Sequence, residues 1–178
     1  MIDGNIKDAS ELAPSILDAG FNMYVTQDLN AAKEYCIQRY AGSETKRYGL
    51  MASSKAYCLS KYGMKLVFQP DVAAWFNKKA SEAGSCCELK ITISEFDCQG
   101  LKIDMPIVGW GNDMLWDGGG WKKFKLDQSV DSEANTYRIN SYRVLLTRGR
   151  DGFITFVPPT DEFQSVYDAL VGAGVEVL

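Results

Sequence analysis

The hydrophobic residues of this 178-residue chain gather into short apolar runs that recur along its length. Short runs rich in β-branched and aromatic residues, bounded by glycine, proline or polar residues, are typical of strands. The pattern predicts strands at 21–27, 47–52, 65–69, 88–94, 106–111 and 153–158.

The segments between these strands carry apolar residues at helical spacing, often behind a capping residue such as Asp28 or Asp161. Helices are expected at 28–40, 55–62, from 70, at 132–148 and from 161. Strands that alternate with helices favour an α/β fold, in which a mostly parallel sheet is flanked by helices in three layers. We expect one domain over 21–178, preceded by a helical lead-in over 1–20 that stops at Gly20.

The segment WDGGGWKKFKL (116–126) departs from this alternation. Three glycines between two tryptophans predict the turn of an aromatic hairpin or flap inserted into the domain, with a polar loop over 127–136. Trp121 and Lys123 belong to a stretch that alternates aromatic residues with cations, as a platform for single-stranded nucleic acid does. A hydrophobic hairpin with a solvated lysine edge is the alternative.

Composition excludes several classes of protein. No apolar run reaches the roughly 18 residues of a membrane span, and the start MIDGNIKDAS does not have a signal-peptide pattern, so we expect a cytoplasmic protein without a membrane partner. The net charge of -4 argues against a surface that binds nucleic acid everywhere, but it allows a local basic site. Histidine is absent, and the five cysteines form no CxxC pair. We therefore expect reduced structural thiols, no metal site and no thiol enzyme.

Two predicted turns follow strands and carry polar residues that could meet a ligand. Gln99 and Gly100 stand after the strand at 88–94, where Gln99 offers a donor and an acceptor and Gly100 permits close backbone approach. Ser53, Ser54 and Lys55 follow the strand at 47–52 and could hold a phosphate. The alternative for Gln99 and Gly100 is an ordinary turn. The alternative for the segment 53–55 is an ordinary helix cap.

The helix expected at 132–148 ends in two arginines. At about 100° per residue, Tyr142, Leu145 and Leu146 share one face. Arg148 lies at the edge of this apolar face, whereas Arg150 lies on the far side. Such guanidinium groups are suited to phosphate, although they also complement the dipole at a helix end.

Taken in order, the motifs ASSKA, SEFDCQGL, WDGG and NSYRVLLTRGRDG resemble those of a known family. The chain is similar, from about Phe21 onward, to the second RecA-like domain of superfamily 1 helicases. It most resembles helicase-like ATPases with a Schlafen-type helicase domain, many of which have no known function. The resemblance implies a RecA-like P-loop NTPase fold.

The resemblance also implies residue roles. The segment 94–104 corresponds to helicase motif V, in which Ser94 contacts nucleic acid while Gln99 and Gly100 meet the nucleotide. The segment 147–150 corresponds to motif VI, in which Thr147 meets the nucleotide and Arg148 is the arginine finger that reaches the γ-phosphate. Arg150 supports Arg148 or pairs with a carboxylate. Ser53, Ser54 and Lys55 would contact nucleic acid, with single-stranded DNA favoured over RNA.

Several departures from the family pattern bear on activity. Lys102 stands where an acidic residue commonly follows Gly-Leu, and the chain has no GxxxxGK[ST] loop for phosphate. We therefore expect the chain to be the C-terminal half of a longer motor, inactive alone. ATP and Mg²⁺ would bind only together with a missing N-terminal RecA-like domain. The alternative is a non-catalytic module that binds single-stranded nucleic acid or protein.

Overall fold

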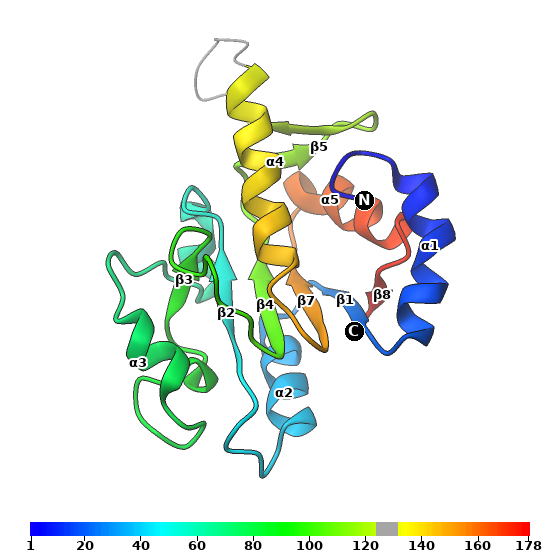
Figure 1. Cartoon of the computed structure of the whole chain (residues 1–178). Helices are drawn as coiled ribbons and strands as arrows, with labels where there is room; N and C mark the ends of the chain where they lie inside the picture. Colours follow the sequence, from blue (N-terminus) through cyan, green and yellow to red (C-terminus); the bar gives the residue numbers. More distant parts are fainter. Residues whose placement is uncertain (124–131) are drawn as a thin grey trace.

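A six-stranded parallel sheet forms the centre of the computed structural model, which describes residues 1–123 and 132–178 (Figure 1). Its strands are β1 (Asn22–Thr26), β2 (Tyr48–Ala52), β3 (Thr92–Ser94), β4 (Met105–Gly109), β7 (Gly152–Phe156) and β8 (Glu176–Val177). They lie in the order β3-β2-β4-β7-β1-β8, and every pairing is parallel. The predicted parallel α/β sheet is confirmed.

Helices cover both faces of the sheet and complete the three predicted layers. The helices are α1 (Ile6–Asp18), α2 (Leu29–Arg39), α3 (Val72–Asn77), α4 (Ser132–Leu146) and α5 (Asp161–Gly172), with 3-10 helices η1 (Tyr57–Tyr62) and η2 (Cys86–Glu88). In Figure 1, α4 crosses in front of the central strands and α2 lies behind them. Within the described residues, no helix has both the length and the apolar character that crossing a membrane requires.

Local capping chemistry sets several of these boundaries. The Asp28 carboxylate accepts hydrogen bonds from the Asn30 and Ala31 amides at 2.8 and 3.2 Å, so α2 begins where the sequence predicts. Gly63 ends η1 with a φ of 89°, a conformation that favours glycine. The last helix differs from the prediction, because Thr160 is the capping residue and Asp161 is the first helical residue.

Three further local predictions were wrong, and one strand was missed. Residues 65–69 form no strand, because Leu66 makes only an isolated bridge and Gln69 has a positive φ of 50°. The strand predicted at 88–94 shortens to β3, since the φ of 54° at Leu89 interrupts extended backbone. The helix predicted at 55–62 is a 3-10 helix. Strand β8, which lies on the far side of β1, was not predicted.

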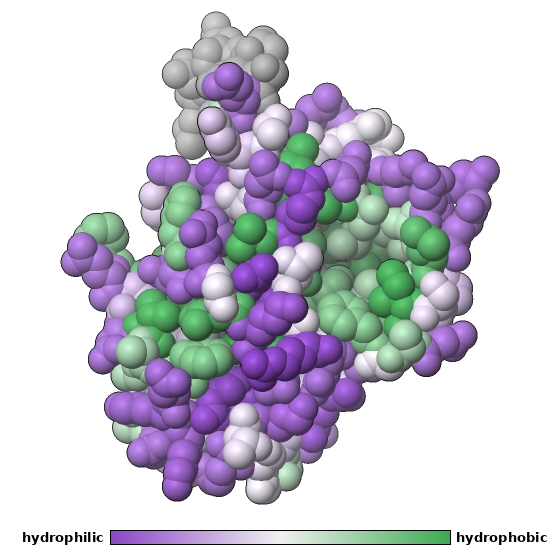
Figure 2. All heavy atoms as spheres, viewed as in Figure 1, coloured by the Kyte–Doolittle hydropathy of each residue, from purple (hydrophilic) through white to green (hydrophobic). Residues whose placement is uncertain are grey.

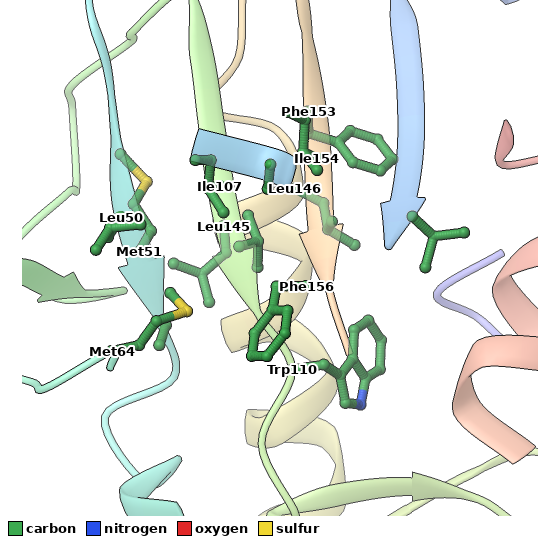
Figure 3. Packing of buried hydrophobic residues seen from close by; sticks show 14 of the residues in the cluster. Leu50, Met51, Met64, Ile107, Trp110, Leu145, Leu146, Phe153, Ile154 and Phe156 are labelled. Atoms are coloured by element: carbon green, nitrogen blue, oxygen red, sulfur yellow. The ribbon is translucent and has the colours of Figure 1, made fainter. Parts of the chain in front are cut away.

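The core fills the space between α4, the sheet and α2. Figure 3 shows Leu145 of α4 beside side chains of the central strands, including Ile107 and Phe156. Each of these side chains is at most 2% exposed. Burial of one such side chain stabilises the fold by about 1.5–3 kcal/mol. Tyr142 and Leu146 are buried with Leu145, which confirms the apolar face predicted for this helix.

An antiparallel hairpin separates β4 from α4, as predicted. Its strands are β5 (Met114–Trp116) and β6 (Trp121–Lys123). The Asp117 carboxylate closes the turn by accepting hydrogen bonds from the Gly119 and Gly120 amides at 3.0 and 2.9 Å. Of the polar loop predicted at 127–136, residues 127–131 lie outside the described part of the chain, whereas 132–136 belong to α4.

A short bridge joins the segments that precede β4 and β7. The Ile103 amide donates to the Arg148 carbonyl at 3.0 Å, and the Arg150 amide donates to the Ile103 carbonyl at 2.9 Å. The chain folds back tightly here, so that a Cβ added to Gly149 would stand 1.7 Å from the Gly152 carbonyl oxygen. Glycine at position 149 is therefore a packing requirement.

We expect Gly149→Ala to lower the free energy of unfolding by about 2–4 kcal/mol, because the contact is with backbone that cannot rotate away. Gly120→Ala is the matched control, because a Cβ there meets nothing within 4 Å and the change should stay within about 0.5 kcal/mol. Urea denaturation followed by circular dichroism measures both. Equal midpoints for the two variants would contradict the packing argument.

Candidate functional site

A groove of about 1070 Å³ opens where β2 and β3 end, with α4 along one side. In parallel sheets, ligands meet the loops at the carboxyl ends of strands. Ser54, Lys55, Ser94 and Gln99, which the sequence analysis places in two separate turns, all line this groove. The fold thus brings four of the predicted site residues to one surface.

Exposed aromatic side chains gather in the same groove. Tyr57, Phe68, Phe96 and Tyr137 line it and are 66–90% exposed. Within the described residues, these are all of the strongly exposed aromatic side chains. Figure 2 shows hydrophobic residues interrupting the hydrophilic surface on the face that carries α4 and β3. No sequence pattern identifies these four residues, because they belong to different segments and to no shared motif.

Arg138 of α4 connects the ends of three strands beneath the groove. Its Nε lies 3.1 Å from an Asp113 carboxylate oxygen, and its Nη1 lies 3.4 Å from a Glu95 carboxylate oxygen. Nη1 also donates to the Ser53 hydroxyl, which itself donates to Asp113 at 2.6 Å. The Arg138, Glu95 and Asp113 side chains are only 14, 5 and 9% exposed, so this network is shielded from water.

Glu95 also holds the turn that follows β2. The Ser54 amide donates to Glu95 Oε2 at 2.6 Å, and the Ser54 hydroxyl donates to Oε1 at 2.9 Å. Ser53, in contrast, is fully buried and its hydroxyl accepts a hydrogen bond from the Lys55 amide at 3.2 Å. Ser54 and the exposed Lys55 therefore face the groove, whereas Ser53 supports them from behind.

Tyr142 completes the network from the next turn of α4. Its hydroxyl donates to Asp113 at 2.9 Å and accepts a hydrogen bond from the Gly111 amide at 2.9 Å. Burial, and then the negative charge of Asp113, raise the pKa of Tyr142 well above its usual value, so the phenol remains a donor. The spacing of Arg138 and Tyr142, four residues apart on one helix, is the signal that could have identified Arg138.

Arg148 lies one turn beyond the groove, near the far end of the turn that carries Gln99. Its Nε donates to the Val144 carbonyl at 3.0 Å, its Nη1 to the Leu101 carbonyl at 3.4 Å and its Nη2 to the Thr147 hydroxyl at 3.4 Å. All three partners are neutral, and no described carboxylate forms an ion pair with this guanidinium. Its charge is therefore positioned but not compensated.

The turn after β3 and the segment after α4 carry the other predicted nucleotide contacts. Gln99 and Gly100 are exposed, and a Cβ on Gly100 would meet nothing within 4 Å. The Thr147 hydroxyl donates to the Arg143 carbonyl at 2.8 Å. Arg150 is exposed, and none of the ion pairs among the described residues includes it.

None of the described hairpin residues lines the groove. Trp121 is 3% exposed, and its ring centroid lies 4.7 Å from that of Trp110. Its indole nitrogen donates to the Met1 carbonyl at 3.0 Å. A base could stack on Trp121 only after the hairpin moves. Lys123 ends β6, but its side chain lies outside what the structure describes, as do Phe124 and Lys125.

All five cysteines are free thiols, as predicted, and only Cys58 is partly exposed. Cys86 and Cys87 are adjacent, with their sulfurs 3.9 Å apart. A hydrogen bond between these thiols lowers the pKa of Cys87 and raises the pKa of Cys86. Both side chains are buried, which fits a packing role.

Comparison with known proteins gives one positive finding. A family model described as "Schlafen group 3, DNA/RNA helicase domain" matches residues 1–159. No curated protein and no solved structure gives a significant match.

Replacing Arg138 with methionine should lower the free energy of unfolding by about 3–5 kcal/mol, because it leaves Glu95 and Asp113 buried without their cation. Arg143→Met is the matched control on the same helix. Arg143 pairs with the exposed Asp3, so its loss should cost at most about 1 kcal/mol. Chemical denaturation compares the two, and similar costs would show that the network is not a buried ion pair.

Proposed function

Because the chain belongs to the Schlafen group 3 DNA/RNA helicase domain family, we propose that it is the C-terminal motor half of an ATP-dependent superfamily 1 helicase or translocase. In this proposal the chain supplies a nucleic-acid groove and the finger Arg148, and an N-terminal RecA-like domain supplies the remaining groups. One observation carries it above the others: the four strongly exposed aromatic side chains of the described residues line a single groove at the ends of β2 and β3.

Single-stranded nucleic acid is the ligand that this groove fits best. Bases stack on exposed aromatic rings with little regard to sequence, as Phe96 and Tyr57 would allow. Lys55 and Lys65 also line the groove and bring cations to the same surface for a phosphate backbone. The chain as a whole carries a net charge of -4, so binding would be confined to this surface.

The residues of this chain fit a nucleotide only in part. The uncompensated guanidinium of Arg148 suits the charge that develops on a phosphoryl group during transfer. The chain has no GxxxxGK[ST] loop, and no group of three or more potential metal ligands occurs within the described residues. We therefore assign the phosphate cradle and the Mg²⁺ ligands to the N-terminal domain. ATP hydrolysis between the two domains would supply the free energy for strand movement.

The arrangement around the turn at 94–101 supports a link between the two sites. Phe96 and Gln99 of this turn line the groove, and the Leu101 carbonyl accepts a hydrogen bond from Arg148. A nucleic-acid strand that shifts Phe96 would therefore act on the same short segment that contacts Arg148. Close connection of this kind is what a motor needs in order to couple binding to hydrolysis.

The second candidate function is a non-catalytic module that binds single-stranded nucleic acid or protein. It is favoured by the fact that the groove is formed wholly within this chain, whereas the phosphate cradle is not. Oligonucleotide binding is common to the motor and to the nucleic-acid module. Only the motor requires Arg148 for ATP hydrolysis.

We expect Phe96→Ala and Tyr57→Ala each to weaken binding of a single-stranded oligonucleotide by about 5–150-fold, because each removes one stacking surface. Fluorescence anisotropy with a labelled oligonucleotide measures the change. Leu12→Ala is the control, because Leu12 is 60% exposed but lies on α1 outside the groove. Equal affinities for all of these proteins would exclude the groove as the binding site.

The isolated chain should hydrolyse no ATP. In a protein that also contains the N-terminal domain, Arg148→Ala should reduce the hydrolysis rate by about 10³–10⁵ and leave oligonucleotide affinity nearly unchanged. Arg39→Ala, on α2, is the control for a general loss of charge. Turnover by the pure chain that disappears in Arg148→Ala would overturn the division of labour proposed above.

A further inference from the structure

The donors that face the groove at the end of β2 already hold an anionic group of the chain itself. The Ser54 amide and hydroxyl donate to the Glu95 carboxylate at 2.6 and 2.9 Å, and Arg138 Nη1 lies 3.4 Å from it. A backbone amide, a hydroxyl and a guanidinium are also the groups that proteins use to bind phosphate oxygens. The Glu95 carboxylate thus has the contacts that a phosphate would have.

We propose that Ser54 and Arg138 form a phosphodiester-binding site, which the Glu95 carboxylate fills until a phosphate of the nucleic-acid strand displaces it. The inference rests on the proposed nucleic-acid function of the groove. It adds a residue that regulates occupancy, and it gives Arg138 a ligand.

The hydrogen-bond balance permits such an exchange. A buried donor left without an acceptor costs about 1–3 kcal/mol, so a site that merely opened would be unfavourable. Here the Ser54 amide and hydroxyl are satisfied in both states, first by the carboxylate and then by phosphate. Arg138 also remains paired, because its closer ion-pair partner is Asp113 at 3.1 Å.

The position of Glu95 also permits displacement. Glu95, Ser54 and Arg138 all line the groove, so the edge of this largely buried network faces an entering nucleic-acid strand. The next residue, Phe96, is 66% exposed, and stacking of a base on its ring would bring the attached phosphate close to Glu95. Repulsion between that phosphate and the carboxylate favours departure of the Glu95 side chain.

Asp97 provides a matched comparison in the same turn. It also lines the groove, and its carboxylate accepts hydrogen bonds from the Ser94 amide and hydroxyl at 2.9 and 2.6 Å. Glu95→Gln and Asp97→Asn each remove one negative charge from the groove and keep an acceptor. Only Glu95→Gln weakens the side chain that competes with phosphate for Ser54 and Arg138.

The test measures binding of a labelled oligothymidylate of about twelve nucleotides to the chain over a range of salt concentrations. Glu95→Gln should tighten binding about tenfold at each salt concentration, because the phosphate then displaces a neutral amide instead of a carboxylate. The slope of log K against log salt should stay as in the wild type, because the same phosphates are bound. Asp97→Asn should change the affinity much less, because Asp97 does not hold Ser54 or Arg138. Adding Ser54→Ala to Glu95→Gln should abolish most of the gain.

The outcomes separate this inference from the proposed function. If the wild-type chain binds the oligonucleotide but Glu95→Gln binds no more tightly than Asp97→Asn, the displacement site is wrong and the groove function stands. If no variant binds even at low salt, both are wrong. NMR of the unaltered chain provides a check that needs no variant. The Ser54 amide resonance should shift on oligonucleotide binding, and an unshifted Ser54 resonance would overturn the inference.

Discussion

The parallel pairing of β4 with β7 is the constraint on which the rest of this structure depends. These strands lie at the centre of the sheet, with Ile107 paired to Ile154, although the hairpin and the whole of α4 separate them in the sequence. The bridge between Ile103 and Gly149 continues the pairing below the strands. It fixes the end of α4 against the turn that follows β3, and the contact of Arg148 with Leu101 follows from it.

A charged cluster strengthens that junction. It lies at the end of the sheet opposite the groove. Lys46 Nζ lies 2.9 Å from Asp104 and 3.0 Å from Asp151, so one cation joins the segments on both sides of the bridge. Desolvation opposes ionisation of Asp151, but hydrogen bonds from Lys46 and Tyr40 lower its pKa. Two ion-pair clusters therefore hold α4 in place, since Arg138 anchors its middle and Lys46 anchors the segment after its end. The second half of the helix, between these two anchor points, can transmit a displacement along its length.

Much of the fold could be predicted because it depends on local chemistry. Asp28 and Asp71 cap helices, and the apolar runs at β2, β4 and β7 are long enough to identify strands without tertiary information. Errors occurred where tertiary context decides. Residues 65–69 have strand-like composition but meet only one strand partner, and β8 is a strand only because β1 offers it an edge.

The candidate site could be predicted only where its residues stand in motifs. Ser54, Lys55 and Gln99 follow strands, and parallel strands bring such turns together. Glu95 and Arg138 are 43 residues apart in sequence, and no spacing rule connects them. Trp121 illustrates the opposite case. The stretch around it has the composition of a stacking platform, but the Trp121 ring is buried against Trp110.

The two edges of the sheet have a consequence for how this unit behaves by itself. Strand β3 forms one edge with three residues and β8 forms the other with two, so neither presents a long row of unpaired backbone groups. Long open edges act as templates for pairing between molecules and lead to aggregation. Edge strands as short as β3 and β8 offer few backbone groups with which another molecule could pair, so the sheet itself disfavours edge-to-edge pairing.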